Sequence, residues 1–243
     1  MNRVDAEPYA PDLSNVQALV VDWDDLYAFS RGQPDNPGPK IAHHKAVAEQ
    51  FGYVLEDDVL DEHWGSGLRN ELPHFYGNPP DVGFEEMLAA FEALNYLYPK
   101  PLLPGARELH DIAGRLGLTR GVVTSHLTAN ARDEIALAGL RPADFDFIHG
   151  SDETPAIKPN PRAFELAITE LSLRGIDPDR AVYLGDSLGD ASAAETGMKF
   201  IGVATGRVAV EGFRQAGFYA EENLRTVGRL LLNRTTPIPD PVS

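Results

Sequence analysis

The second half of the sequence alternates between helical and strand patterns, and this alternation is the feature that most constrains the fold. After Gly105, each amphipathic segment is followed by a short apolar run. Such alternation is typical of a parallel sheet, because each strand needs a helical crossover before the next parallel strand. The paired segments are 106–116 with 120–125, 128–138 with 145–150, 161–171 with 180–186, and an alanine-rich helix with 199–204.

An insertion separates this alternating part from an earlier apolar run at 16–22, which predicts a first buried strand. Proline and glycine cluster at 30–40 and again at 99–105, which predicts two linker strands. Between the linkers, two stretches with apolar residues at helical spacing, 41–51 and 84–98, are separated by a short acidic turn.

These patterns predict an α/β core with a helical insertion after its first strand. The expected boundaries are 14–30 and 100–233 for the core, 31–99 for the insertion with its linkers, and 1–13 and 234–243 for the tails. Three prolines in 235–243 predict that the last stretch is a loose tail.

The charge of the chain excludes some classes of partner. With 21 basic and 37 acidic residues the formal net charge is -16, which repels nucleic acids and anionic membrane surfaces. The N-terminus lacks a signal-peptide pattern, and no apolar run approaches the roughly 20 residues that span a bilayer. We therefore expect a cytoplasmic protein that binds neither nucleic acid nor membrane; its oligomeric state is left open.

Polar side chains gather where the expected strands end, at the edge of a parallel sheet where ligands bind. Cysteine is absent, so oxygen and imidazole are the available metal ligands, and the carboxylates favour a hard cation such as Mg²⁺. The side chains are Asp22, Asp24, Thr124, Ser125, Lys158, Asp186 and Asp190.

This set of groups suits phosphoryl transfer through an aspartyl phosphate. A carboxylate can attack phosphorus only if a cation offsets the repulsion between the two anions. A hydroxyl and an ammonium group then hold the remaining phosphate oxygens, and a second carboxyl group can donate and accept the proton.

These side chains form four motifs along the sequence, and the motifs, in this order, resemble those of the haloacid dehalogenase (HAD) superfamily of hydrolases. The motifs are Asp22 with Asp24, Thr124 with Ser125, Lys158, and Asp186 with Asp190. The resemblance covers about 16–203 and points to the subgroup with helical caps, which includes enzymes like phosphoglycolate phosphatase and β-phosphoglucomutase. It implies a Rossmann-like parallel sheet, with the insertion acting as the cap. Asp25 and Leu26 stand where this family usually has the glycine and threonine of its DxDGT motif.

The resemblance also implies a role for each polar residue. Asp22 would be the nucleophile and Asp24 the general acid and base, while Thr124 and Lys158 would bind phosphate, with Ser125 beside them. The expected Mg²⁺ site consists of Asp22, the backbone carbonyl of Asp24 and Asp186 as ligands, with Asp190 behind them.

Arg69 is the candidate for a substrate contact from the cap. It ends a stretch, 65–69, that resembles the glycine-containing loop by which such caps reach the active site; the alternative is a surface ion pair. The insertion also carries four histidines, but their spacings form no tight zinc site, and surface or packing roles are favoured. They are His43, His44, His63 and His74.

We therefore predict a Mg²⁺-dependent phosphatase that hydrolyses a small phosphorylated metabolite. Two alternatives stay open: a sugar phosphomutase of the same fold, and a catalytically weak phosphate-binding or regulatory module. The second alternative is favoured by Leu26, because a hydroxyl that could orient the nucleophile's loop is absent.

Overall fold

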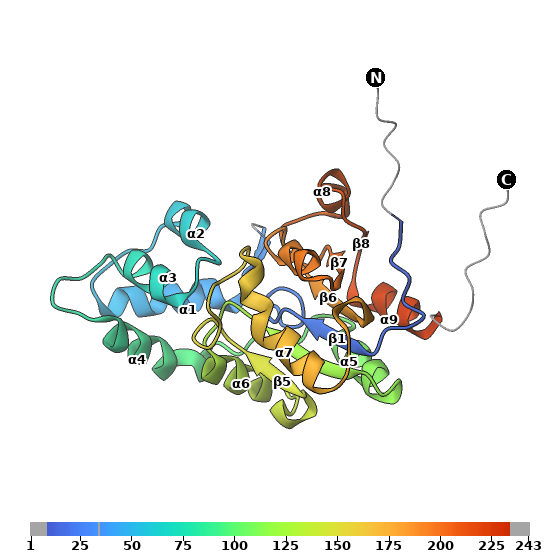
Figure 1. Ribbon diagram of the computed structural model, residues 1–243. Coiled ribbons are helices and arrows are strands. Elements are labelled where there is room, and N and C mark those ends of the chain that lie inside the picture. Colours follow the sequence, from blue (N-terminus) through green and yellow to red (C-terminus); the bar gives the residue numbers. More distant parts are fainter. Residues whose placement is uncertain (1–8, 34, 234–243) are drawn as a thin grey trace, which may run out of the picture.

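A parallel sheet lies between two layers of helices, with a further group of helices to one side, in the computed structural model of the chain (Figure 1). The structure describes residues 9–33 and 35–233. Residues 1–8 of the expected N-terminal tail (1–13) and the whole expected C-terminal tail (234–243) lie outside the described residues. The sheet confirms the predicted α/β class. In spatial order its strands are β5 (Phe147–His149), β4 (Thr119–Val123), β1 (Ala18–Val21), β6 (Ala181–Gly185), β7 (Lys199–Val203) and β8 (Ala220–Glu221).

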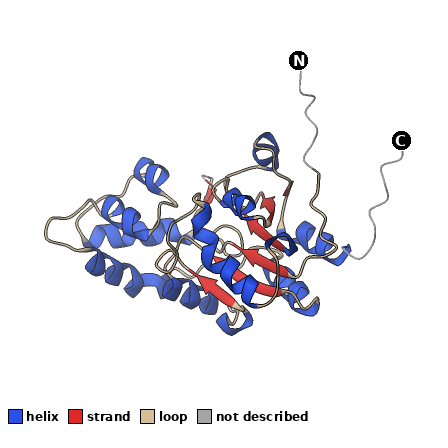
Figure 2. Cartoon of the chain, in the orientation of Figure 1, coloured by secondary structure: helices blue, strands red, loops and turns tan. Residues whose placement is uncertain are grey.

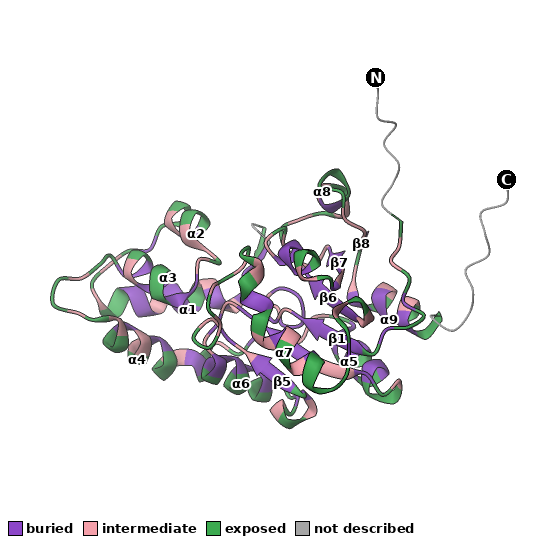
Figure 3. Cartoon of the chain, in the orientation of Figure 1, coloured by how far each residue is buried: buried purple, intermediate pink, exposed green. Residues whose placement is uncertain are grey.

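Each face of the sheet packs against its own helices, because successive strand residues point to opposite faces. All four residues of β1 are buried, as a central strand covered on both faces requires (Figure 3). One face is covered by α5 (Ala106–Arg115), α6 (Thr128–Leu137) and α9 (Leu224–Asn233). The other face is covered by α7 (Glu165–Leu173), α8 (Val210–Gln215) and the 3₁₀ helices η3 (Pro161–Phe164) and η5 (Asp190–Thr196).

The C-terminal part of the sheet differs from the prediction. The alanine-rich segment forms the 3₁₀ helix η5 instead of an α-helix, and β8, α8 and α9 were not expected. β8 has two residues and α8 has six, so neither is long enough to show a period in the sequence. Short 3₁₀ helices η2 (Pro142–Asp144) and η4 (Pro178–Arg180) precede β5 and β6.

The helices to one side come from the insertion, which contains no strand between its linkers (Figure 2). They pack around an apolar cluster of their own, which includes Val47, Leu72, Phe75 and Phe91. The helices are α1 (Pro39–Gln50), α2 (Asp57–His63), α3 (Leu68–Phe75) and α4 (Phe84–Leu94), followed by η1 (Asn95–Leu97).

The prediction of two helices joined by an acidic turn was therefore wrong in one respect. The acidic segment itself forms α2, whose first turn contains Asp57 and Asp58, where carboxylates interact favourably with the helix dipole. α3 has eight residues, about two turns, which is too short for its apolar period to stand out.

His43 and His44 both lie inside the apolar cluster of the insertion, where they pack. Their rings stack at 6.0 Å, and both are buried because α1 contacts α3 and α4, which enclose them. Burial lowers the pKa of His43 to about 4.

The second linker runs beside the segment 27–29, which leads into the first linker, at the carboxyl edge of the sheet. The backbone N–H of Phe29 donates to the carbonyl of Pro101 at 2.8 Å, and that of Leu103 donates to the carbonyl of Tyr27 at 2.8 Å. The first linker also contains a small hairpin of β2 (Gly32–Gln33) and β3 (Asn36–Pro37). Among the described residues, no helix is both long and apolar enough to cross a membrane.

Candidate active site

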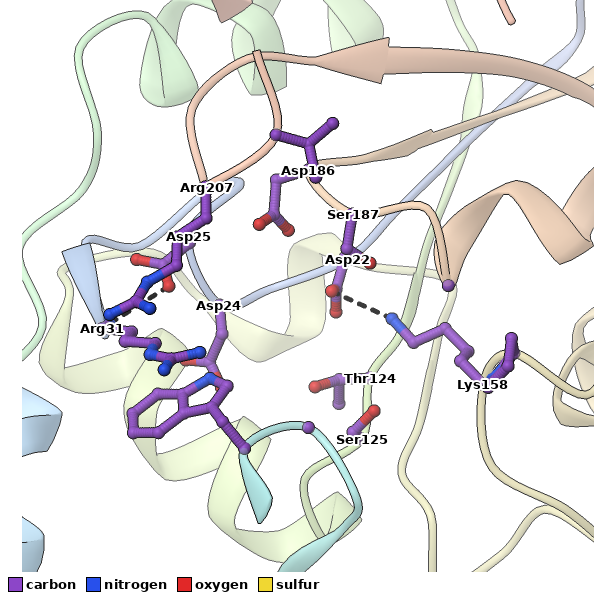
Figure 4. A pocket seen from close by; sticks show the side chains of 15 residues that line it. Asp22, Asp24, Asp25, Arg31, Thr124, Ser125, Lys158, Asp186, Ser187 and Arg207 are labelled. Atoms are coloured by element: carbon purple, nitrogen blue, oxygen red, sulfur yellow. Dashed lines mark hydrogen bonds and ion pairs between the residues drawn. The ribbon is translucent and has the colours of Figure 1, made fainter. Parts of the chain in front are cut away.

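A cavity of about 330 Å³ opens at the carboxyl edge of the sheet. The register places Val21 opposite Val122 on one side and Leu184 on the other, so the residues that follow the three strands meet at this edge. Six of the predicted site residues line the cavity, and Figure 4 shows them pointing into it. They are Asp22, Asp24, Thr124, Ser125, Lys158 and Asp186.

Lys158 joins the carboxylates of this edge. Its Nζ lies 2.9 Å from Oδ2 of Asp22 and 2.7 Å from Oδ1 of Asp190, and it is 3.2 Å from the hydroxyl of Tyr183. Burial lowers the pKa of Lys158, but the attraction of Asp190 and Asp22 outweighs burial and raises it well above its usual value. The ammonium group therefore stays charged at the base of the cavity.

Asp22 lies directly after β1, and its carboxylate is held in one orientation. Its Oδ1 accepts the backbone N–H of Trp23 at 2.7 Å, while Oδ2 faces Lys158. Burial, together with the neighbouring Asp190 and Asp24, raises the pKa of Asp22 to about 7 against the pull of Lys158. Burial and the carboxylates of Asp190 and Asp22 also raise the pKa of Asp186 well above its usual value.

The donor set fits a hard divalent cation. Oxygen atoms of Asp22, Asp186 and Asp190 all lie within 4.8 Å of one another, and carboxylate oxygens are the ligands that Mg²⁺ prefers. Burial and the neighbouring carboxylates raise the pKa of Asp22 and of Asp186 despite Lys158, and a bound cation would lower both. Asp190 is already engaged by Lys158 and by the hydroxyl and N–H of Ser187, which leaves Asp22 and Asp186 as the side chains best placed to bind a metal directly.

Thr124 and Ser125 follow β4 and provide hydroxyl groups beside Asp22. Thr124 is buried, and its N–H donates to the carbonyl of His149 at 3.0 Å, which holds it to the neighbouring strand β5. Its Oγ1 accepts the N–H of His126 at 3.2 Å, which orients the hydroxyl at the cavity wall.

The carboxylate of Asp24 is surrounded by three cationic or imidazole groups. Nζ of Lys100 lies 2.8 Å from Oδ1, while Nε2 of His126 and Nζ of Lys40 lie 2.6 Å and 3.3 Å from Oδ2. Burial raises the pKa of Asp24, but His126, Lys100 and Lys40 outweigh burial and hold it well below its usual value. Asp24 is therefore an anion in this arrangement.

Glu134 on α6 completes this buried network, because its Oε2 lies 2.7 Å from Nζ of Lys100. Asp24, His126 and Glu134 come close enough together to suit a metal ion. Lys40 and Lys100 already supply two positive charges there, so the cluster is an ion-pair network and does not fit a further cation.

Asp25 and Leu26 support the loop that follows Asp22. Asp25 has a positive φ of 52°, a conformation that glycine adopts most easily, and its carboxylate accepts the backbone N–H groups of Ser30, Arg31 and Gly32. Burial raises the pKa of Asp25, although these N–H groups oppose the shift. Leu26 is fully buried in the core, so apolar packing stands where the family usually has a hydroxyl.

Arg69 does not reach the cavity. Its side chain is 71% exposed, its guanidinium lies over the ring of Phe84 at 4.3 Å, and it forms a 3.8 Å ion pair with Glu85. The insertion reaches the cavity through Trp64 and Gly65 instead, so part of the predicted glycine-containing loop lines the site.

Several residues of the site were not found by sequence reasoning. Arg31 and Arg207 line the cavity from loops that no motif marks, and Lys40, Lys100 and His126 surround Asp24. The two lysines carry one signal that could have been used, because each stands next to a proline in a linker.

The fold and the cavity together define an α/β protein whose acidic site lies at the carboxyl edge of a parallel sheet. Residues 28–197 match the family model of haloacid dehalogenase-like hydrolases. The chain therefore belongs to this family of hydrolases, which confirms the resemblance seen in the sequence. No curated protein matches the chain closely enough to add a named relative.

Solved structures share the fold. CbbY from Rhodobacter sphaeroides in complex with phosphate superimposes with a TM-score of 0.71 at 23% identity, covering 88% of this chain and 96% of that one. A predicted phosphoglycolate phosphatase from Haemophilus somnus 129PT gives 0.71 at 16% identity, covering 89% and 98%. β-Phosphoglucomutase from Clostridium difficile gives 0.66 at 15% identity, covering 90% and 97%.

The raised pKa of Asp22 predicts a pH-dependent stability. A raised folded-state pKa means that the neutral carboxyl stabilises the fold; this contribution is complete below the usual value of 3.8 and is lost as pH rises through about 7. Asp22→Asn mimics the neutral form. We expect the free energy of unfolding of D22N, relative to that of the wild type, to rise by a few kcal/mol as the pH is raised from about 4 to about 8. Urea unfolding in the presence of EDTA measures this difference.

The exposed Asp133, on α6, provides the control for this measurement. Asp133→Asn should follow the wild type at every pH. A stability difference between D22N and the wild type that does not change with pH would contradict the raised pKa of Asp22.

The buried network around Asp24 predicts a large difference between two lysine substitutions. Lys100→Met leaves Glu134 and Asp24 buried without one cation, so the free energy of unfolding should fall by about 3–5 kcal/mol. Lys45→Met removes an exposed ion pair with Asp57 and should cost less than about 1 kcal/mol. Urea unfolding at neutral pH measures both, and equal small losses would contradict the network's contribution.

Proposed function

We propose that the chain is a Mg²⁺-dependent phosphatase that hydrolyses a small phosphorylated metabolite through an aspartyl phosphate on Asp22. One observation carries the proposal: a fixed carboxylate, a buried lysine, a buried threonine and a second acidic group converge on one cavity. These are Asp22, Lys158, Thr124 and Asp186. The family membership supports hydrolysis, and CbbY, which has a similar fold, has been solved in complex with phosphate.

In the first proposed step, an oxygen of Asp22 attacks phosphorus and the bond from phosphorus to the ester oxygen breaks. The leaving alkoxide takes up a proton. In the second step, water attacks the phosphorus of the aspartyl phosphate, which releases orthophosphate and restores the Asp22 carboxylate. Lys158 and Thr124, with Ser125, bind the phosphoryl oxygens in both steps.

Mg²⁺ bound by Asp22 and Asp186 would neutralise the charge between the carboxylate and the phosphoryl group. The backbone carbonyl of Asp24 would complete the protein ligands. Asp190 would not bind the metal directly; it positions Lys158 and Ser187 through hydrogen bonds.

Asp24 is proposed as the proton donor and acceptor, and this role requires a change in its surroundings. Its carboxylate is an anion held by Lys40, Lys100 and His126, so it takes up a proton only when some of these contacts open. Lys40 lies in the first linker and Lys100 in the second, which connects the protonation of Asp24 to movement of the linkers. We propose that 31–99 acts as a cap on the core (14–30 and 100–233) and excludes water from the cavity when it closes.

The direct test is the release of inorganic phosphate from an aryl phosphate with Mg²⁺ or with EDTA. The wild type should release phosphate only with Mg²⁺, and Asp22→Asn should reduce the rate at least about a thousandfold because the nucleophile is lost. Asp133→Asn, remote from the cavity, should match the wild type. D22N activity at the wild-type level would contradict the assignment of the nucleophile.

Product analysis separates the proposal from its nearest alternative. The nearest alternative is a sugar phosphomutase, because β-phosphoglucomutase from Clostridium difficile has a similar fold. With a sugar phosphate as substrate, a phosphatase releases orthophosphate in proportion to substrate consumed, whereas a phosphomutase retains phosphate on the sugar.

A further inference from the structure

Two arginines lie together at the cavity, on the side away from Lys158 (Figure 4). Arg31 comes from the first linker and Arg207 from the loop after β7. Both guanidinium groups contact the same oxygen, Oδ1 of Asp61 on α2; the Arg207 contact is 2.9 Å long. A single carboxylate therefore faces two cations.

The environment of Arg31 makes it a strong anion-binding group. Its side chain is 10% exposed, its guanidinium lies 4.7 Å from the centre of the Trp64 ring, and its Nε has no hydrogen-bond partner in the described part of the chain. Burial and the neighbouring Arg207 lower the pKa of Arg31, because the buried Arg31 is poorly solvated and the two positive charges repel each other. An anion that reaches both groups relieves this repulsion.

Three of the carboxylates that line the cavity are engaged elsewhere. Asp22 contacts Lys158, Asp24 is held by its own network, and Asp25 accepts three backbone N–H groups. Asp61 is different, because its side chain is 57% exposed and it belongs to the cap helix α2. Because the Asp61 carboxylate is already largely hydrated, a competing anion can displace it from the arginines at a lower free-energy cost than a buried carboxylate.

We propose that Arg31 and Arg207 form a second anion subsite, so that the preferred substrate is a small phosphate monoester that carries another anionic group, such as a carboxylate. This inference rests on the proposed phosphatase function and names its substrate class. The phosphoryl group binds at Asp22, Thr124 and Lys158, and the second anion replaces Asp61 between the arginines. The cavity of about 330 Å³ suits a molecule of this size.

The acidic insertion also restricts the size of an anionic substrate. The insertion has 11 acidic and 2 basic residues between 41 and 98, which disfavours large polyanions. A compact substrate with two anionic groups avoids most of that surface, because Lys158 and the two arginines receive both groups inside the cavity.

Matched substrates test the subsite. Carboxyalkyl phosphates and alkyl phosphates of the same chain length, from ethyl to butyl, differ in the second anion alone. At one chain length or more, the wild type should show a kcat/KM about tenfold or more higher for the carboxylated ester. Arg207→Gln should reduce this preference about tenfold or more, because one of the two cations is lost.

Two further variants separate substrate binding from a purely structural tie between the cap and the core. Asp61→Asn should raise the preference for the carboxylated ester, since the internal competitor is removed. Arg162→Gln, which breaks an exposed ion pair with Glu165, should keep the wild-type preference. A structural tie alone would change kcat/KM for both esters by the same factor in R207Q and D61N, which would overturn the subsite.

The outcomes also separate this inference from the function on which it rests. Turnover of an aryl phosphate with no preference for carboxylated esters at any chain length contradicts the anion subsite and leaves the phosphatase assignment standing. No Mg²⁺-dependent turnover of any phosphate ester contradicts the phosphatase assignment, and the subsite with it.

Discussion

The contact of Lys158 with Asp22 and Asp190 is the interaction on which the rest of the site depends. Three carboxylates from two strand ends meet within 4.8 Å, and such a group is stable only where positive charge compensates it. Lys158 supplies one charge, yet burial and the neighbouring carboxylates still raise the pKa of Asp22 to about 7 and that of Asp186 well above its usual value. The parallel sheet brings these three carboxylates to one edge, where a divalent cation would compensate their remaining negative charge.

A second set of charges connects the site to the insertion. Asp24 stands two residues after Asp22, and it is held by Lys40 and Lys100 from the two linkers and by His126 from the loop after β4. Asp61 of the insertion in turn contacts Arg31 and Arg207 at the cavity. Ion pairs therefore connect the position of the insertion with the surroundings of Asp24 and with the two arginines.

The sequence was sufficient for the fold class and for the residues that follow the strands. Parallel strands place their carboxyl ends at one edge, so the periodicity of the sequence was enough to predict that Asp22, Thr124 and Asp186 lie close together. The position of Lys158 was predicted from its place in the series of motifs. Residues that act through tertiary contacts could not be found this way. Arg31 and Arg207 meet because a linker and a distant loop converge, and Arg69 lies outside the cavity because α3 directs it toward Glu85. Short elements such as α2, α3 and β8 have too few residues to show a period.

The most direct test of the central claim, that Asp22 accepts the phosphoryl group with Mg²⁺ beside it, is a crystal structure with Mg²⁺ and beryllofluoride, a mimic of a phosphoryl group bound to a carboxylate. The account predicts beryllium bonded to a carboxylate oxygen of Asp22, fluorides contacting Lys158 and Thr124, and Mg²⁺ between Asp22 and Asp186. Beryllofluoride absent from Asp22 in crystals that contain Mg²⁺, or bonded to another carboxylate, would contradict the account.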